Sequence, residues 1–177
     1  MLGRFENFSE NVHGIAFLTF KAPLQQIQLA ITDAFHLLNQ RKYRFDEIAG
    51  SYIQANANCE VNFEVGIGES ATFTFLDEKE LARLEVEIME KRLAFLDFLC
   101  VFKYYVSNET QGKAPLKFDY YMLRFRFDID SVELSVFHER GPRHVHVEEV
   151  IGFIIEYVGN EAAKEWNFSL KTERIQT

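Results

Sequence analysis

The sequence predicts an α+β fold, in which an antiparallel or mixed sheet of about five strands packs on two or three helices. Two segments alternate apolar and polar residues on both sides of a short turn, which is typical of β-hairpins. An apolar segment near the start of the chain is typical of a buried strand. Apolar residues at three- and four-residue steps elsewhere indicate helices, one of them long and central.

The N-terminal strand is predicted over residues 13–21. Odd- and even-numbered residues of this segment are both mainly apolar, as expected of a central strand that is covered on both faces. Pro23 suits the first position of the helix that follows, where its missing N–H is not needed. Residues 23–40 carry an apolar stripe at helical spacing, so we expect an amphipathic helix there.

The first hairpin is predicted over residues 60–75, where apolar and polar residues alternate before and after the loop 66–70. Pairing Val65 with Ala71 keeps apolar partners together on one face of the hairpin. The same register also gives the pairs Phe63 with Phe73 and Val61 with Phe75.

The long central helix is predicted over residues 78–99. Asp77 is a suitable N-cap, and Glu80 three residues later completes a capping box. The apolar stripe continues to Leu99, so we expect this helix to be the hydrophobic spine of the fold. Asp97 lies within it, and a rim or partnered position is expected for its carboxylate.

The second hairpin is predicted over residues 117–140, and its register satisfies both faces. One face pairs apolar residues, and the other brings Arg126 opposite Glu133. The pairs of this register are Phe127 with Val132, Phe125 with Leu134, Leu123 with Val136, and Tyr121 with His138. Residues 147–159 then carry an apolar stripe and predict a final helix packed on the sheet.

Composition and charge limit the class of protein. The formal net charge of −8 argues against broad binding to nucleic acid or acidic membranes, because the overall field repels phosphate. Cys59 and Cys100 lie singly in apolar segments, as expected of reduced thiols in a cytoplasmic protein. The most apolar run, 93–106, is too short to span a bilayer. We expect a single domain over residues 1–177, with at most a weak subdivision near the polar loop 107–115.

Residues 138–149 concentrate the titratable side chains of the chain, since they hold three of its five histidines around Gly141-Pro142. A purely structural explanation makes His138 a hydrogen-bonded histidine at the edge of the core. In that explanation Arg140 and Arg143 pair with nearby glutamates, and such surface pairs contribute roughly 0–1 kcal/mol.

A metal site is the first functional hypothesis for this segment. His144 and His146 are two residues apart, so in an extended segment both imidazoles would project to one side and ligate a divalent metal such as zinc. A third ligand is then needed, and His138, Glu139 or His13 would supply it.

Acid–base chemistry on a phosphodiester, as in a ribonuclease, is the second hypothesis. A histidine near neutral pKa would move the proton while arginines hold the phosphate. The candidate catalytic residues are His138, Glu139, Arg140, Arg143, His144 and His146. A local basic patch would permit contact with RNA, and its members would be Arg124, Arg126, Arg140 and Arg143.

From the sequence, we favour an interaction or assembly module that has no catalytic activity. The chain is rich in aromatic residues, with 18 Phe and 7 Tyr, and the apolar run 93–106 suggests a helix face that pairs two copies. The prediction is therefore a cytoplasmic, homodimeric interaction module. The alternative is a phosphodiester hydrolase, with or without a metal, centred on residues 138–146.

Overall fold

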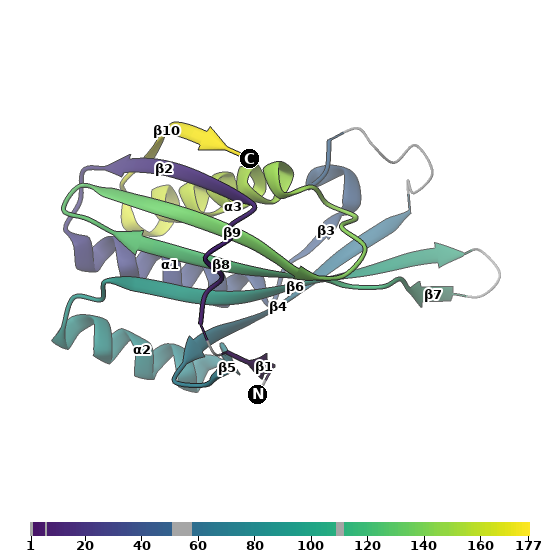
Figure 1. The fold of residues 1–177 in the computed structure, drawn as a ribbon, viewed down its shortest axis with the longest axis horizontal. Helices are drawn as coiled ribbons and strands as arrows, with labels where there is room; N and C mark the ends of the chain where they lie inside the picture. The colour runs from purple at the N-terminus through teal and green to yellow at the C-terminus, as the bar shows by residue number, and fades with distance from the viewer. Residues whose placement is uncertain (1, 6, 51–57, 109–111) are drawn as a thin grey trace.

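The protein is a large antiparallel sheet with three α-helices packed on one of its faces (Figure 1). The computed structural model describes residues 2–5, 7–50, 58–108 and 112–177. In these ranges the strands are β1 Gly3–Arg4, β2 Gly14–Phe20, β3 Lys42–Arg44, β4 Cys59–Glu69, β5 Thr72–Phe75, β6 Phe95–Asn108, β7 Gly112–Pro115, β8 Asp119–Phe127, β9 Ser131–Arg140 and β10 Leu170–Gln176. The helices are α1 Leu24–Leu38, α2 Glu78–Glu90 and α3 Val147–Glu161, which a short π-helix, Ala162–Trp166, extends.

The strand order along the sheet is β1-β5-β4-β6-β8-β9-β2-β10, with β3 beside β4 and β7 beside β6. The described residues thus form ten strands, and the expected sheet of about five was wrong in size. Several of the extra strands are only two to four residues long, which is too short for an alternating pattern to be visible. The loop expected over residues 107–115 lies largely in the paired strands β6 and β7.

The predicted long central helix was also wrong, because α2 ends at Glu90 and the chain then enters β6. β6 is a central strand, and most of its side chains are covered on both faces of the sheet. Most of its positions are therefore apolar, and such a run also fits the three- and four-residue spacing of a helix. The connection between α2 and β6 is held from α1. The buried Gln28 amide donates to the carbonyl oxygen of Leu93 (2.6 Å) and accepts from its N–H (3.3 Å).

The first hairpin exists, but its predicted register was wrong. Gly66 pairs with Phe75 and Gly68 with Phe73, so the strands join through a tight turn at Ser70, whose φ is 54°. The register differs from the predicted one by an odd number of residues, which moves Phe73 to the opposite face of the sheet. Phe73 packs there against Phe5, with ring centroids 4.7 Å apart.

The second hairpin was predicted correctly. β8 and β9 pair Phe127 with Val132 and Tyr121 with His138, as expected, and Arg126 lies opposite Glu133. The ladder shifts beyond Tyr121, where Tyr120 pairs with Arg140, so Glu139 is the extra residue of a β-bulge. Helix α1 and helix α3 also lie close to their predicted bounds.

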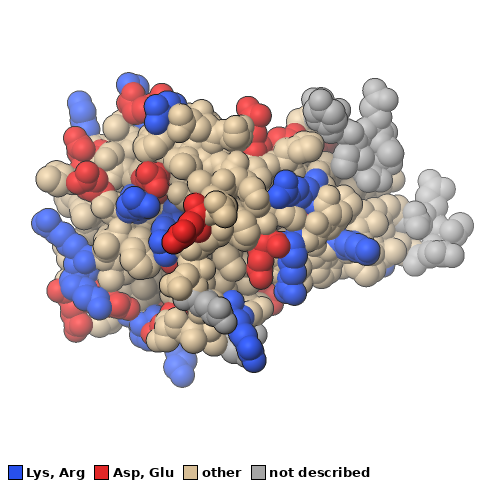
Figure 2. Space-filling model, viewed as in Figure 1, with Lys and Arg blue, Asp and Glu red and all other residues tan. Residues whose placement is uncertain are grey.

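The two faces of the sheet are covered differently. The helices bury the main core on one face, whereas the N-terminal segment crosses the other and packs Phe5 and Phe8 on a smaller apolar cluster (Figure 1). We call this second side the helix-free face. Basic and acidic side chains are interspersed on it, and much of its surface is uncharged (Figure 2). In the described part of the chain, no helix has the length and apolar character needed to cross a membrane.

A buried ion pair lies on the helix-free face. Asp97 is 3% exposed and accepts two hydrogen bonds of 2.7 Å from Nε and Nη2 of Arg124. The guanidinium group also lies over the rings of Phe8 (4.8 Å) and Phe95 (4.3 Å). Asp97 is therefore partnered, as expected, although it lies in a strand and not in a helix.

Candidate functional site

The segment 141–146, which we call the corner loop, leads from β9 to α3 and passes over the start of β8. Gly141 has a φ of 115°, and a Cβ there would collide with the side chain of Asp119 and the carbonyl oxygen of Phe118. Only glycine fits this position without strain. Arg143 also has a left-handed backbone, with a φ of 59°.

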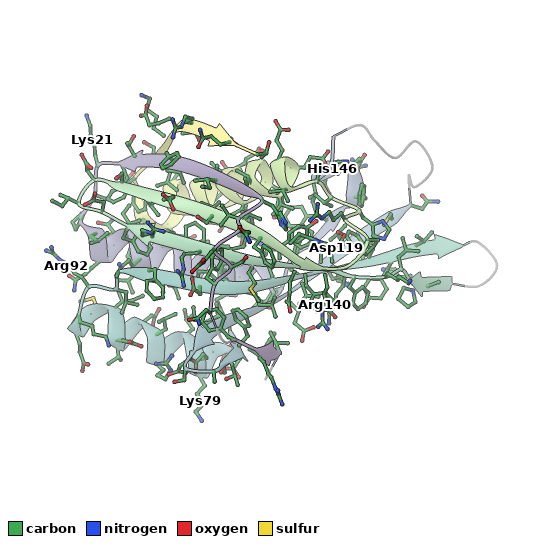
Figure 3. The ribbon with its side chains drawn as sticks, viewed as in Figure 1. Lys21, Lys79, Arg92, Asp119, Arg140 and His146 are labelled. Carbon is green, nitrogen blue, oxygen red and sulfur yellow. The ribbon has the colours of Figure 1, made fainter. Side chains whose placement is uncertain are left out.

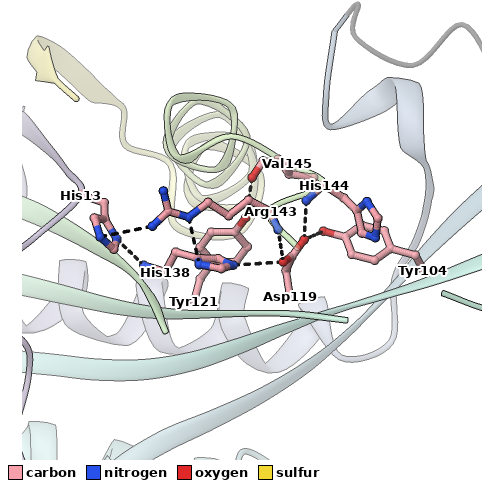
Figure 4. A network of polar contacts seen from close by, with 8 residues as sticks. All are labelled: His13, Tyr104, Asp119, Tyr121, His138, Arg143, His144 and Val145. Carbon is pink, nitrogen blue, oxygen red and sulfur yellow. Dashed lines mark hydrogen bonds and ion pairs between the residues drawn. The ribbon is translucent and has the colours of Figure 1, made fainter. Parts of the chain in front are cut away.

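Asp119, the first residue of β8, accepts the hydrogen bonds that hold the corner loop, and its side chain is fully buried (Figure 4). Its Oδ1 accepts from the N–H of Arg143 (2.7 Å) and from Nε2 of His138 (3.0 Å). Its Oδ2 accepts from the N–H of His144 (2.7 Å) and from the hydroxyl of Tyr104 (2.9 Å). These four donors replace the water that a buried carboxylate loses, so Asp119 fastens the corner loop to β6 and β8.

The hydrogen bonds of His138 determine its tautomer. Nε2 donates to the carboxylate of Asp119, and Nδ1 accepts from Nε of Arg143 at 3.1 Å. A neutral imidazole with its proton on Nε2 satisfies both contacts. Both ring nitrogens are therefore occupied, and neither is free to accept a proton from a substrate or to ligate a metal.

Two tyrosines support this network. Tyr121 donates its hydroxyl hydrogen to the carbonyl oxygen of Val145, directly before α3, and its ring contacts that of His138 (4.9 Å between centroids). Burial raises the pKa of Tyr121 and of Tyr104 above the usual range, and the nearby charge of Asp119 adds to both shifts. Both phenols thus keep the hydrogen that their bonds require.

His13, at the start of β2, completes the network on its outer side. Its Nδ1 accepts from the backbone N–H of His138 (2.9 Å), and its ring stacks on Phe137 (4.8 Å between centroids). Nη2 of Arg143 lies 3.3 Å from Nε2 of the same imidazole. Burial, followed by the charge of Arg143 and by His138, lowers the pKa of His13, which favours the neutral ring.

The structure brings together only part of the predicted site. His138, Arg143 and the main chain of His144 converge on Asp119. Glu139 is exposed at the bulge, and Arg140 lies over the ring of Tyr120 (3.9 Å) on the helix-free face. Figure 3 shows Asp119 between Arg140 and His146, which precedes α3. The N–H of His146 donates to Oε2 of Glu149 (3.0 Å).

The two predicted metal ligands, His144 and His146, lie in a bent segment and not in an extended one. The ring of His144 packs edge-on against Tyr104 (4.8 Å), and its Nε2 has no hydrogen-bond partner in the described structure. Among the described residues, no three His, Cys, Asp or Glu side chains are grouped as a metal ion would require. A zinc site here stays a prediction without a third ligand.

The four arginines of the predicted basic patch do not gather. Arg124 pairs with Asp97 and Arg126 with Glu133 (3.6 Å), whereas Arg140 is opposite Tyr120, at the other end of β8. A strand advances roughly 3.3 Å per residue, so this separation exceeds the reach of one phosphate.

Asp119 and Tyr104 are the central residues that the sequence interpretation missed. The predicted register placed Tyr121 opposite His138, and Asp119 lies two residues before Tyr121 on the same face. A carboxylate one step along that face from a histidine was the available signal. Tyr104 carried no such signal, because it lies in the apolar run 93–106, which was interpreted as a helix face.

Comparisons of the chain with protein-family models, with curated proteins and with solved structures find no match. The function is therefore inferred from the geometry of the site alone.

Proposed function

We propose that the protein is an interaction module without catalytic activity, which docks a protein partner on the helix-free face beside the corner loop. One observation carries this proposal: the titratable groups of the corner are used in holding the fold. Asp119 accepts four internal hydrogen bonds, and both nitrogens of His138 are engaged. Catalytic acids and bases instead need a free position that faces a substrate.

The surface beside the corner has the composition of a docking site. Tyr120 and Phe137 are half-buried, and each stacks with a cationic or imidazole group: Arg140 lies over Tyr120, and His13 lies on Phe137. Tyrosine, phenylalanine and arginine are enriched in protein interfaces, because they bury large areas and lose little conformational freedom.

A protein partner agrees with the charge of the molecule better than a nucleic acid does. The net charge is −8, and the helix-free face carries interspersed charges of both signs (Figure 2). Nucleic-acid binding draws most of its affinity from a broad basic surface, which this arrangement does not supply.

Two other expectations lose their original support. The apolar run 93–106, which suggested a dimer interface, is the central strand β6 and is largely buried in the monomer, so homodimerisation stays a prediction. The hydrolase alternative named His138, His144 and His146, and both ring nitrogens of His138 are occupied. It would now depend on His144, on His146 or on the neighbouring His13.

Site-specific photo-crosslinking tests the proposal. A photoreactive phenylalanine replaces Tyr120 in one variant and, as the control, the exposed Val86 on α2 in another. We expect a protein adduct from position 120 that position 86 does not give, and the purified adduct partner should bind wild-type chain more tightly than Tyr120→Ala. Equal adducts from both positions, no adduct, or RNA cleavage that is lost in His13→Asn would contradict the proposal.

A further inference from the structure

His13 and Arg143 present two hydrogen-bond donors to each other. Nδ1 of His13 accepts from the N–H of His138, so the proton of the neutral ring must be on Nε2. Nη2 of Arg143, which can only donate, lies 3.3 Å from that nitrogen. This contact is therefore not a hydrogen bond, and an acceptor placed beside the pair would satisfy both groups.

Both donors are held in place from behind. The ring of His13 is fixed by the backbone of His138 and by stacking on Phe137. The guanidinium of Arg143 is fixed by its Nε bond to His138, and its main chain is tied to Asp119 (Figure 4). A preorganised pair loses little conformational entropy when a ligand binds.

Arg143 also retains its full charge for a ligand. In the described part of the chain, no carboxylate forms an ion pair with it, although the protein has an excess of acidic residues. Its side chain is exposed. Because Nε is occupied by His138, the free donors are the two terminal nitrogens, which can receive two oxygens of one group end-on.

We infer that His13 and Arg143 form a binding site for a single oxyanion group, a phosphate or a carboxylate, carried by the partner. This inference rests on the proposed docking function and names the chemistry that the docking face recognises. The negative charge of the whole molecule favours one group held at short range over an extended polyanion.

Titration of the full chain with inorganic phosphate and, separately, with acetate tests the site, with sodium chloride at equal ionic strength as the reference. The readouts are the side-chain ¹⁵N–¹H resonances of His13 and Arg143. We expect saturable shifts of both that chloride does not reproduce. Tighter phosphate binding would indicate a phosphorylated partner, and tighter acetate binding a carboxylate.

Two variants remove the donors one at a time. His13→Asn keeps an oxygen that can accept from the N–H of His138 but lacks the donor at the position of Nε2. Arg143→Gln removes the positive charge of the guanidinium. Each should weaken anion binding by roughly tenfold, as expected for a charge-assisted hydrogen bond. The matched control Arg140→Gln removes the guanidinium that lies over Tyr120 and should change affinity less than about twofold.

The inference is overturned if wild-type chain shows no saturable shift, or if His13→Asn and Arg143→Gln both bind the anion as wild type does. His13→Asn remains informative if Arg143→Gln fails to fold. The titration needs no partner protein. A failed titration together with a specific adduct at position 120 would therefore reject the oxyanion site and keep the docking function.

Discussion

Asp97 and Asp119 are both buried carboxylates, but the protein satisfies them in different ways on opposite faces of the sheet. Asp97 is 3% exposed and meets one full positive charge, the guanidinium of Arg124. Asp119 is 0% exposed and meets donors from two main-chain N–H groups, one phenol and one imidazole. The first arrangement joins two neighbouring strands, whereas the second fixes the path of a loop.

This difference predicts which carboxylate the fold depends on more. Asp97 accepts its hydrogen bonds from the side chain of Arg124, which is 23% exposed. If Asp97 is replaced, water can therefore take over part of the interaction that Arg124 loses. The partners of Asp119 include main-chain groups that cannot move away without unfolding the corner loop. Asp119 should therefore be the more costly residue to change.

The largest effect is expected for Asp119→Asn. The amide replaces one acceptor oxygen with a donor that faces another donor, which leaves at least one buried N–H unsatisfied. We expect the free energy of unfolding to fall by about 3–4 kcal/mol, measured by urea denaturation. Tyr104→Phe, which removes a single hydrogen bond to the same carboxylate, should cost only about 1 kcal/mol. Equal losses for the two variants would contradict the central role of Asp119.

A smaller loss is expected for Asp97→Asn, about 2 kcal/mol by the same measurement, because Arg124 keeps its two aromatic contacts and some access to water. Replacing both residues by apolar ones, Asp97→Leu with Arg124→Met, should recover most of this loss, since neither charge is then left unpaired. A double variant less stable than Asp97→Asn would show that the pair itself, and not the orphaned charge, sets the cost.

A third carboxyl group is compensated less completely, and its substitution should have the smallest effect and the opposite sign. Asp33 on α1 is partly exposed, and burial together with Glu85 on α2 raises its pKa to about 6, while Trp166 and His36 act in the lowering direction. The folded state therefore holds this proton more tightly than the unfolded state. Stability from Asp33 is present below about pH 4 and is lost as the pH rises through 6.

Asp33→Asn removes this ionisation, so the variant should gain stability over wild type as the pH rises. After allowance for solvent screening, we expect a gain of about 1 kcal/mol at pH 8 and almost none at pH 4. Thermal unfolding across this pH range measures it. The prediction fails if the difference between the two proteins does not depend on pH.

Elements with a recognisable pattern on both faces were predicted more accurately from the sequence than elements with a pattern on one face or on neither. The register of β8 and β9 was predicted correctly because both faces imposed a pairing, apolar on one and Arg126 with Glu133 on the other. β6 was mistaken for a helix because a strand covered on both faces has no alternation to detect. The first hairpin had only one informative face, and its register was wrong.

The candidate site shows the same limit. Local spacing identified His138 and Arg143, and it named His13 as a neighbour. It did not identify Asp119 as their common partner, because the four donors come from β6, β9 and the corner loop, and their meeting depends on the tertiary fold. The histidine pair at 144 and 146 had a metal-like spacing, but the corner loop bends the chain between them.

The most direct test of this account is the tautomer of His138 at neutral pH, read from the ¹⁵N resonances of its imidazole. If Asp119 organises the corner loop as described, Nε2 carries the proton and Nδ1 is the unprotonated acceptor of the Arg143 bond. A proton on Nδ1, with Nε2 unprotonated, would mean that the ring does not donate to Asp119. That result would contradict the assignment of His138 to a structural role.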